Sequence, residues 1–452
     1  MVLASALAVL LASVPTAPAK LPLRPCFAQG VAAKCGTLQV PENRDTGLGR
    51  KIGLEVVVIP AARKPAHRDA FTYLAGGPGG AAASEMPSTA VSLWSRVHER
   101  RDILLVDQRG TGASHALECP APAKKLGTEP ALRAYIDKCT ASLDGDATQY
   151  GTAAAADDLE AVRVALGYRK LDVYGTSYGA TVAQVYLARH PNAVRSVVLD
   201  GGTLVDIPFY SRFAPNGQRA IDQIARRCAA TGACARAFPR WAQQLRSLVK
   251  AWNAHPVRLA KAGTLSGDGL AGVIQTMTLN AESAASVPLV VARAAAGKHA
   301  TLAPFIRDED MTRSIMYWSI WCNESWVGLD AAGPWGTYLD GTAADALETY
   351  RMVCKYFPKH AEPASSKTRV RSDVPLLALV GGADPQDPIG NLAGLRSAMP
   401  NSRAVVVPGL GHAIGQYGCL PNLVGQFVER ADAKRLDARC ARSIKPPPFV
   451  LR

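Results

Sequence analysis

The fold is decided by the stretch Leu171-Asp172-Val173-Tyr174-Gly175-Thr176-Ser177-Tyr178-Gly179. Its first four residues form a mainly apolar, strand-like run, and the segment 180–190 that follows is rich in small residues and compatible with a helix. A strand, a tight turn and a helix are therefore predicted, with Ser177 at the apex. Glycines two residues before and after a serine allow the strained turn that lifts a nucleophilic hydroxyl out of a sheet.

A nucleophilic serine needs a histidine base and an acid that fixes the imidazole tautomer. Asp384 directly follows a late apolar run, and His412 comes shortly after the next one. Because open α/β sheets place their sites at the carboxyl ends of the strands, all three side chains are expected at one edge. We predict Ser177, Asp384 and His412 as the catalytic residues. Asp387 and Asp200 remain alternatives for the acid.

The same chemistry needs two backbone N–H groups that form an oxyanion hole. Tyr178, the residue after the predicted nucleophile, supplies one of them. The other is expected from the loop Gly76-Gly77-Pro78-Gly79-Gly80, which follows an early strand-like run. We predict Gly77, with Gly76 as the alternative. Ser114 also follows a glycine-rich loop, but no strand–turn–helix pattern surrounds it, so a hydrogen-bonding loop role is predicted.

Strand-like runs recur along the chain, and from the third onward helical patterns separate them. The runs are 52–59, 71–74, 103–106, 171–174, 197–199, 376–380 and 404–407. Near-continuous apolar strands alternating with helices predict a mostly parallel central sheet with helices on both faces. The helices include 153–166, with Thr152 as N-cap candidate, and a crossover at 391–399.

The alternation stops after Asp200 and resumes at Val374. The segment between them is predicted to be mostly helical. We therefore predict an α/β core in two parts, residues 20–204 and 373–452, with an inserted helical domain at 205–372. The second part carries the predicted catalytic acid and histidine.

The first nineteen residues differ from the rest of the chain. An apolar run too short to span a bilayer ends at Ala17-Pro18-Ala19, a small-residue cleavage pattern before Lys20. Residues 1–19 are predicted to be a signal peptide, which favours a secreted or periplasmic protein; an apolar N-terminal strand is the alternative. No other stretch is long and apolar enough to predict a membrane span.

Ten cysteines agree with export, and none of them forms a Cys-x-x-Cys pair. The even count and the spacing make five bridges between sequence neighbours the simplest pairing, although spacing alone does not fix the connectivity. The alternative is that all ten are reduced core residues of a cytosolic protein.

The chain carries a net charge of +14, from 51 Lys and Arg against 37 Asp and Glu. The basic residues are spread out and not interleaved with aromatics, so no nucleic-acid partner is predicted. The sequence contains no P-loop, no Gly-x-Gly-x-x-Gly after a strand and no His-Glu-x-x-His. No metal site and no organic cofactor are predicted.

Three motifs carry a family resemblance. They are Gly76-Gly77-Pro78-Gly79-Gly80, Asp107-Gln108-Arg109-Gly110-Thr111-Gly112-Ala113-Ser114 and Gly175-Thr176-Ser177-Tyr178-Gly179. Together they resemble the prolyl iminopeptidase and tripeptidyl aminopeptidase family of α/β-hydrolases, and the second is the most specific. The stretch 157–167, and Gly411-His412 followed by Cys419 and Cys440, are similar to its secreted tripeptidyl aminopeptidase-like branch.

The resemblance implies an α/β-hydrolase fold with a helical cap at 205–372, and hydrolysis at the free N-terminus of peptides. In the family a cap carboxylate binds the substrate's α-amino group. Ile320-Trp321-Cys322-Asn323-Glu324 resembles the corresponding cap segment, which implies Glu324 in this role, with a solvated or structural Glu as the alternative. The chain departs from the family at Ala75, where a histidine is usual, and at Phe357-Pro358, where Trp-Pro is usual.

These observations predict an exported serine aminopeptidase that acts on a small peptide substrate through an acyl-enzyme intermediate. A secreted esterase or other acyl hydrolase with the same triad is the first alternative. A catalytically silent binding protein of the same fold is a minor one, since none of the three predicted catalytic residues is missing.

Overall fold

A computed structural model describes residues 20–64, 66–122, 126, 128–259, 263–306 and 314–452 of the chain. The predicted signal peptide, residues 1–19, lies outside the described residues and stays a prediction.

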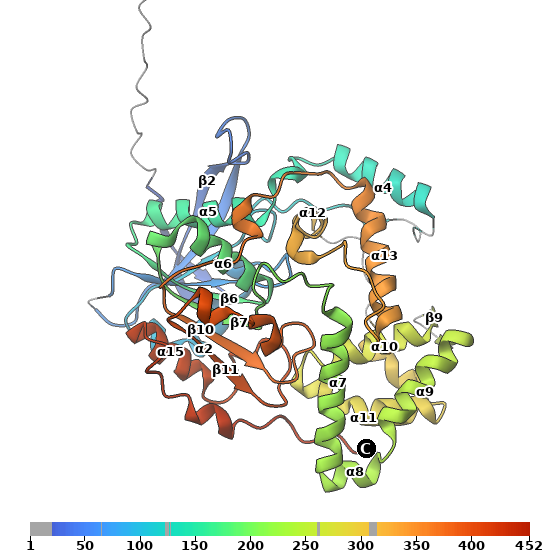
Figure 1. The fold of residues 1–452 in the computed structure, drawn as a ribbon. Coiled ribbons are helices and arrows are strands. Elements are labelled where there is room, and N and C mark those ends of the chain that lie inside the picture. Colours follow the sequence, from blue (N-terminus) through green and yellow to red (C-terminus); the bar gives the residue numbers. More distant parts are fainter. Residues whose placement is uncertain (1–19, 65, 123–125, 127, 260–262, 307–313) are drawn as a thin grey trace, which may run out of the picture.

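A nine-stranded sheet forms the centre of the fold, in the order β1-β2-β3-β5-β4-β6-β7-β10-β11 (Figure 1). The strands are β1 (Arg24–Ala28), β2 (Val31–Pro41), β3 (Lys51–Ile59), β4 (Ala70–Leu74), β5 (Ile103–Val106), β6 (Leu171–Thr176), β7 (Val194–Asp200), β10 (Leu376–Gly381) and β11 (Ser402–Val407). Across the sheet, the neighbours β1-β2, β2-β3 and β3-β5 pair antiparallel. All the following neighbours, from β5-β4 to β10-β11, pair parallel. The predicted mostly parallel sheet is confirmed.

Helices cover both faces of this sheet. They are α1 (Ala82–Glu85), α2 (Pro87–Leu93), α3 (Ser95–His98), α5 (Thr152–Leu166), α6 (Tyr178–Arg189), α14 (Leu395–Ala398) and α15 (Leu420–Arg430). A further helix, α4 (Glu129–Ala141), lies away from the sheet beside α13 (Asp340–Tyr356) of the inserted segment (Figure 1). Successive strand residues point to opposite faces, so Leu104 packs in one apolar cluster with Leu159 of α5, and Leu105 packs in the other with Phe427 of α15.

The chain leaves the sheet after β7 and returns at β10. Between them lie α7 (Phe213–Ala230), α8 (Gly232–Ala237), α9 (Trp241–Ala254), α10 (Gly267–Met277), α11 (Ala281–Ala295), α12 (Ile315–Asn323) and α13 (Asp340–Tyr356), with a small antiparallel pair, β8 (Val257–Leu259) and β9 (Gly263–Leu265). Most of these elements lie to one side of the sheet (Figure 1). None of the helices in the described part of the chain is both long and apolar enough to cross a membrane.

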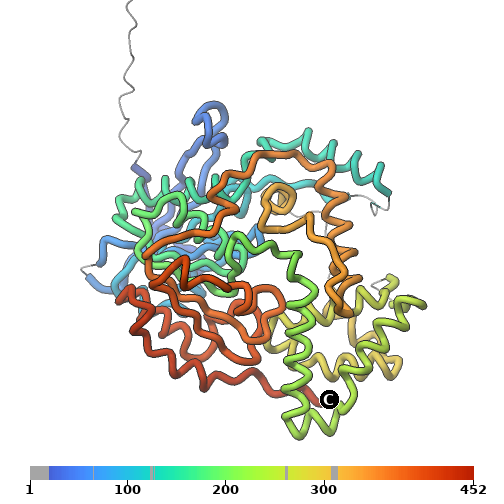
Figure 2. The backbone as a smooth tube through the Cα atoms, in the orientation of Figure 1, coloured from blue at the N-terminus to red at the C-terminus, as the bar shows by residue number. Residues whose placement is uncertain are grey.

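The C-terminal tail returns to the inserted helices (Figure 2). The backbone N–H of Val450 donates to the carbonyl oxygen of Ala285 in α11 at 3.1 Å, and the guanidinium of Arg227 in α7 lies 4.2 Å from the ring centre of Phe449. The end of the chain therefore ties the insertion to the second part of the core.

The ten cysteines form five disulfides between sequence neighbours, which confirms the predicted pairing. They are Cys26–Cys35, Cys119–Cys139, Cys228–Cys234, Cys322–Cys354 and Cys419–Cys440. The bond between Cys322 and Cys354 joins α12 to α13 inside the insertion.

Two local predictions are wrong. Thr152 is the first residue of α5 and not its N-cap, which is Gly151, because the Thr152 hydroxyl bonds to Glu324 instead of capping the helix. The crossover predicted at 391–399 is broken into a short 3₁₀ turn, Ile389–Leu392, and the one-turn helix α14. Gly394 separates the two with a φ of +83°, which a continuous helix does not allow.

Candidate active site

Ser177 stands at the sharp turn between β6 and α6. Its φ of 55° and ψ of −123° are unusual for a residue with a side chain, and its backbone N–H donates to the carbonyl oxygen of Asp200 at 3.0 Å. The turn needs glycine at position 179, since a Cβ there would lie 2.1 Å from the carbonyl oxygen of Leu74. The strand–turn–helix predicted from the sequence is the observed local structure.

His412 and Asp384 meet at the same edge of the sheet. Nδ1 of His412 lies 2.8 Å from Oδ2 of Asp384. The other oxygen, Oδ1, accepts hydrogen bonds from the backbone N–H groups of Gln386 at 2.8 Å and Asp387 at 2.9 Å. With Asp384 fully buried and both of its oxygens occupied, the carboxylate is fixed and orients the imidazole.

The two alternative acids lie differently. Oδ2 of Asp387 is 3.5 Å from Nδ1 of His412, farther than Asp384. Asp200 accepts hydrogen bonds from the backbone N–H groups of Ile414 and Gly415 at 2.7 and 2.9 Å, and from the Tyr174 hydroxyl. Asp200 therefore holds the loop that follows His412, and Asp384 is the carboxylate with hydrogen-bond geometry to the imidazole.

The insertion also supports the histidine. The backbone N–H of His412 donates to the carbonyl oxygen of Leu279, between α10 and α11, at 2.7 Å. A Cβ at Gly411 would lie 2.4 Å from that oxygen, so the close approach requires glycine. The sequence carries no side-chain signal for this contact, because the acceptor is a backbone carbonyl.

Three carboxyl groups act on the imidazole electrostatically. Burial alone would lower the pKa of His412, but Asp384, Asp387 and Asp200 outweigh it and raise that pKa above its ordinary value. Burial would raise the pKa of Asp384, but His412 and the hydrogen bonds to this carboxylate lower it. Burial raises the pKa of Asp387 to about 7. Asp384 is thus the carboxylate best stabilised in its charged form.

The second imidazole nitrogen of His412, Nε2, is available to accept or donate a proton. In the described part of the chain Nε2 of His412 is buried and meets no hydrogen-bond partner. A buried polar atom without a partner in a native structure asks for an explanation, and transfer of a substrate or serine proton at this atom provides one.

A cavity of about 70 Å³ lies beside Ser177. Its lining residues are Gly77, Ser177, Tyr178, Thr181, Thr203, Leu204, Val205, Ile207, Phe209, Trp321, Trp326, Gln386 and Asp387. The two tryptophans and Val205, Ile207 and Phe209 belong to the insertion predicted at 205–372, and the others come from core loops, the residues after β7 and the start of α6. The cavity beside Ser177 is therefore lined by both the core and the insertion, with apolar and polar walls.

The two predicted oxyanion-hole residues both line this cavity. The backbone N–H of Tyr178 belongs to the first turn of α6, where amides have no acceptor within the helix. The alternative, Gly76, lies against Ser177, since a Cβ there would be 3.0 Å from Cβ of Ser177. Of the two glycines, only Gly77 lines the cavity.

The motif at 107–114 holds the segments next to the site in place through hydrogen bonds. Asp107 accepts hydrogen bonds from the backbone N–H groups of Ala83 and Ser84, at 2.7 and 3.1 Å, in the helix that follows the glycine loop. Ser114 Oγ accepts from the Glu55 N–H at 2.8 Å, in agreement with its predicted loop role.

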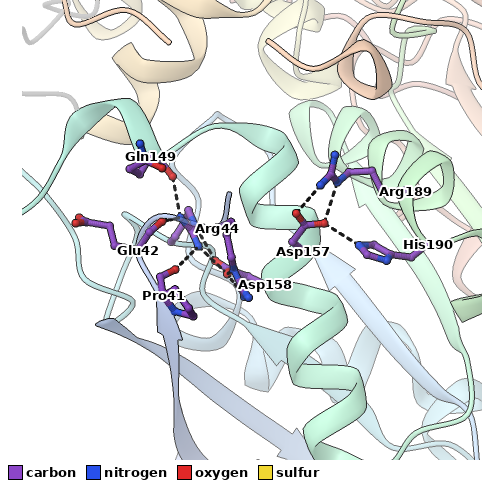
Figure 3. Close-up of polar contacts among 9 residues, drawn as sticks. Pro41, Glu42, Arg44, Gln149, Asp157, Asp158, Arg189 and His190 are labelled. Atoms are coloured by element: carbon purple, nitrogen blue, oxygen red, sulfur yellow. Dashed lines mark hydrogen bonds and ion pairs between the residues drawn. The ribbon is translucent and has the colours of Figure 1, made fainter. Parts of the chain in front are cut away.

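Arg109 is fully buried and joins three parts of the core. Its guanidinium forms two hydrogen bonds to Asp158 of α5, at 2.7 and 2.8 Å, and donates to the carbonyl oxygens of Glu42 and Gln149. Arg44 contacts Asp158 from the other side, and the adjacent Asp157 pairs separately with Arg189 and His190 (Figure 3). The most specific motif therefore serves as scaffold, with Asp158 as its partner.

Glu324 lies behind the cavity wall. Its oxygens accept hydrogen bonds from the N–H and the hydroxyl of Thr152 and from the indole N–H of Trp326, each at 2.7 Å. Thr152 in turn bonds to the Tyr178 hydroxyl at 2.8 Å. Glu324 lines a second cavity of about 330 Å³ with Arg44, Arg189 and His360, and not the one beside Ser177. Burial raises the pKa of Glu324 to about 7.

With this geometry established, comparison with known proteins gives the family. A model of the alpha/beta hydrolase fold matches residues 74–415, which include all of the residues above that surround Ser177. The chain belongs to the α/β-hydrolase fold family. It is thus a hydrolase-family protein whose predicted fold is confirmed.

Three relatives of this α/β-hydrolase have names. Serine protease Hip1 of Mycobacterium tuberculosis is 31% identical over 227 residues, 45% of this chain and 42% of that protein. Tripeptidyl aminopeptidase of Streptomyces coelicolor is 29% identical over 187 residues, which are 37% of this chain and 34% of that protein. Putative hydrolase YuaR of Escherichia coli is 26% identical over 270 residues, 54% and 52%. The predicted resemblance to tripeptidyl aminopeptidases is confirmed, and the matches span about a third to a half of each relative.

Among the solved structures similar to this chain is a proline iminopeptidase from Mycobacterium smegmatis. It has a TM-score of 0.41 and is 16% identical, and the match covers 88% of this chain and 98% of that one. A serine hydrolase from Cycloclasticus zankles has a TM-score of 0.39 and 14% identity over 87% and 98%.

Proposed function

We propose that this chain is an exported serine aminopeptidase that cleaves short peptides from a free N-terminus through an acyl-enzyme intermediate. The observation that carries the proposal is the 2.8 Å contact between His412 and a buried, doubly hydrogen-bonded Asp384, with Nε2 of the same imidazole left without a partner. Such a histidine is oriented as a general base for a nearby nucleophile.

In the proposed reaction, Ser177 Oγ attacks the carbonyl carbon while Nε2 of His412 takes the serine proton. The N–H groups of Gly77 and Tyr178 stabilise the oxyanion that develops, and Asp384 stabilises the imidazolium. The tetrahedral intermediate collapses as His412 gives the proton to the leaving amine. Water then attacks the acyl-enzyme with His412 again as the base, which releases the acid and restores Ser177.

Peptides are the favoured substrates because relatives of this chain are named serine protease and tripeptidyl aminopeptidase. Recognition of the free N-terminus needs a carboxylate near the nucleophile, and Glu324, predicted from the family resemblance, is one candidate. Export is supported by the five disulfides, since such bonds persist in oxidising compartments, and by the predicted signal peptide.

A secreted esterase is the second candidate, because the cavity beside Ser177, whose walls are partly apolar, also suits a short acyl group. A silent binding protein is disfavoured by the hydrogen-bonded His412 and Asp384 pair.

The test compares matched fluorogenic amides with free and N-acetylated amino termini, together with a short-chain ester. Activity largely confined to the free-amine amides, and absent in Ser177→Ala, supports the aminopeptidase. Ester turnover without preference for a free amine identifies the esterase and overturns the peptidase proposal. A Ser177→Ala variant as active as the wild type overturns the assignment of the nucleophile.

A further inference from the structure

We propose that Asp387 binds the α-ammonium group of the substrate and that the cavity beside Ser177 admits a single small N-terminal residue. This inference rests on the proposed aminopeptidase function and names its specificity residue. The enzyme then releases one residue at a time, because the residue whose ammonium Asp387 binds is also the residue whose carbonyl Ser177 attacks.

The first argument is the position and state of the Asp387 carboxylate. Asp387 lines the same cavity as Ser177 and is only 9% exposed. Its Oδ1 accepts a hydrogen bond from Thr203, which is itself held by Asn391 at 2.7 Å. No described residue donates a hydrogen bond to Oδ2, whose closest charged group is His412 at 3.5 Å. One oxygen thus anchors the side chain and the other remains available to a donor.

The second argument is charge. Apart from the tyrosine hydroxyl of Tyr178, Asp387 is the only ionisable group among the residues that line this cavity. Arg219 of α7 donates to the backbone carbonyls of Gly382 and Asp384, and no ion pair joins it to Asp387 in the described part of the chain. His412 lies 3.5 Å from Oδ2 of Asp387 but does not line the cavity, so on the cavity side this carboxylate is complementary to a cation brought by the ligand.

The third argument is size. The space beside Ser177 is small, about 70 Å³. A space of this size favours a small N-terminal side chain over a large one. The other walls include the apolar side chains of Leu204, Val205, Phe209 and Trp321, beside the polar Thr181, Thr203 and Gln386, so a small apolar side chain finds an apolar surface to contact.

Glu324 is the competing carboxylate. Three donors, from Thr152 and Trp326, occupy its oxygens, and it faces the second cavity behind Tyr178. Glu324 thus already uses three of its about four acceptor positions and lies outside the cavity beside Ser177, whereas Asp387 lines that cavity and has one oxygen free of hydrogen bonds.

The experiment measures kcat and KM for four substrates: an alanine amide with a free amine, its N-acetyl form, a tripeptide amide with a free amine, and p-nitrophenyl acetate. Wild type, Asp387→Asn and Glu324→Gln are compared at one pH of about 7.5, below the α-amino pKa of about 8, so that the substrate carries an ammonium group. Asp206→Asn is the matched control, since this carboxylate pairs with Arg369 at 2.9 Å and does not line the cavity.

We expect the wild type to prefer the free-amine alanine amide over both the N-acetyl and the tripeptide amides. In Asp387→Asn the ratio of kcat/KM for the free-amine alanine amide to that for its N-acetyl form should fall by about tenfold to a hundredfold. The cause is the loss of one charge-assisted contact, and the change should appear mainly in KM. An unchanged thermal unfolding transition shows that the variant is folded, and its turnover of the N-acetyl amide is the reference against which its preference is measured. Inhibition of ester turnover by free alaninamide should weaken in parallel.

Three results would overturn the inference while leaving an aminopeptidase: an unchanged preference in Asp387→Asn, a loss confined to Glu324→Gln, or a wild type that favours the tripeptide amide. An equal loss on all four substrates would also overturn it, since Asp387 would then act only through His412. A wild type indifferent to the free amine would instead contradict the proposed function itself.

Discussion

Three carboxyl groups lie near the imidazole of His412. They belong to Asp200 at the end of β7, Asp384 after β10, and Asp387 three residues further along the chain. Asp384 contacts Nδ1 at 2.8 Å, Asp387 lies at 3.5 Å, and Asp200 holds the backbone that follows the histidine. This arrangement gives each acid a separate part: orientation of the base, contact with the cavity, and support of the loop.

Replacement of the two nearer acids should separate their roles. In Asp384→Asn the imidazole loses the acceptor that fixes its tautomer, and ester kcat should fall by about 10³–10⁴-fold. In Asp387→Asn ester kcat at the pH plateau should change by less than about tenfold, because Asp384 remains in place. Steady-state turnover of a neutral ester measures both, and the reverse order would make Asp387 the catalytic acid.

The pH profile of ester turnover should be displaced to alkaline pH. Neighbouring carboxylates raise the pKa of His412, and the reaction needs the neutral imidazole, so activity rises as pH rises through that pKa. The midpoint is therefore expected above the ordinary value of about 6.5. Asp387→Asn removes a negative charge and should move the midpoint to lower pH. A midpoint below 6.5 in the wild type would contradict this electrostatic description.

Among the elements, the core strands were predictable because each is a short, nearly continuous apolar run between turns, as in 103–106. The hairpin of β1 and β2 was not recognised, because most of its residues are exposed or half-buried and its buried residues, Ala33, Leu38 and Val40, are separated along the chain and give no such run. Thr152 was misassigned for a related reason: its hydroxyl has a tertiary partner, Glu324, 172 residues away. Local propensity cannot anticipate a competing partner of that kind.

At the site, the order and the strand-end positions of Ser177, Asp384 and His412 were readable from the sequence. The Leu279 carbonyl that holds the histidine was not, nor was the separation of Glu324 from the cavity. Both depend on how the insertion docks on the core, which no local pattern encodes.

The buried Arg109–Asp158 pair should be a determinant of stability. Arg109→Leu leaves Asp158 without its bidentate partner and leaves the Glu42 and Gln149 carbonyls without a donor. The free energy of unfolding should fall by about 1.5–3 kcal/mol, because buried hydrogen bonds to a charged group are lost while Arg44 still pairs with Asp158. Urea denaturation measures the loss. Arg133→Leu, at an exposed i,i+4 pair with Asp137, is the control and should cost less than about 0.5 kcal/mol. Equal losses would contradict a scaffold role for Arg109.

At the scale of the whole molecule, the insertion contributes directly to the candidate site. It supplies Trp321 and Trp326 to the cavity wall and the Leu279 carbonyl to His412, and the C-terminal tail packs against it. Changes within the insertion should therefore affect turnover as well as stability.

Loss of the disulfide between Cys322 and Cys354 should lower both turnover and stability. The bond closes a separation of 32 residues and joins α12, which bears Trp321, to α13. Cys322→Ser with Cys354→Ser should lower the free energy of unfolding by about 2–4 kcal/mol and reduce turnover of the free-amine amide. Removal of the N-terminal pair, Cys26 and Cys35, should spare turnover, since that bond lies far from the cavity in the sheet order. Equal effects on turnover would argue against a catalytic part for the insertion.

The account depends most on Ser177 as an activated nucleophile, and covalent labelling tests this directly. The protein is treated with a fluorophosphonate, digested and mapped by mass spectrometry, beside Ser177→Ala and His412→Gln. We predict one adduct, on Ser177, that is absent from Ser177→Ala and forms at least a hundredfold more slowly in His412→Gln. An adduct on another serine, or equal labelling of the wild type and His412→Gln, would contradict the account.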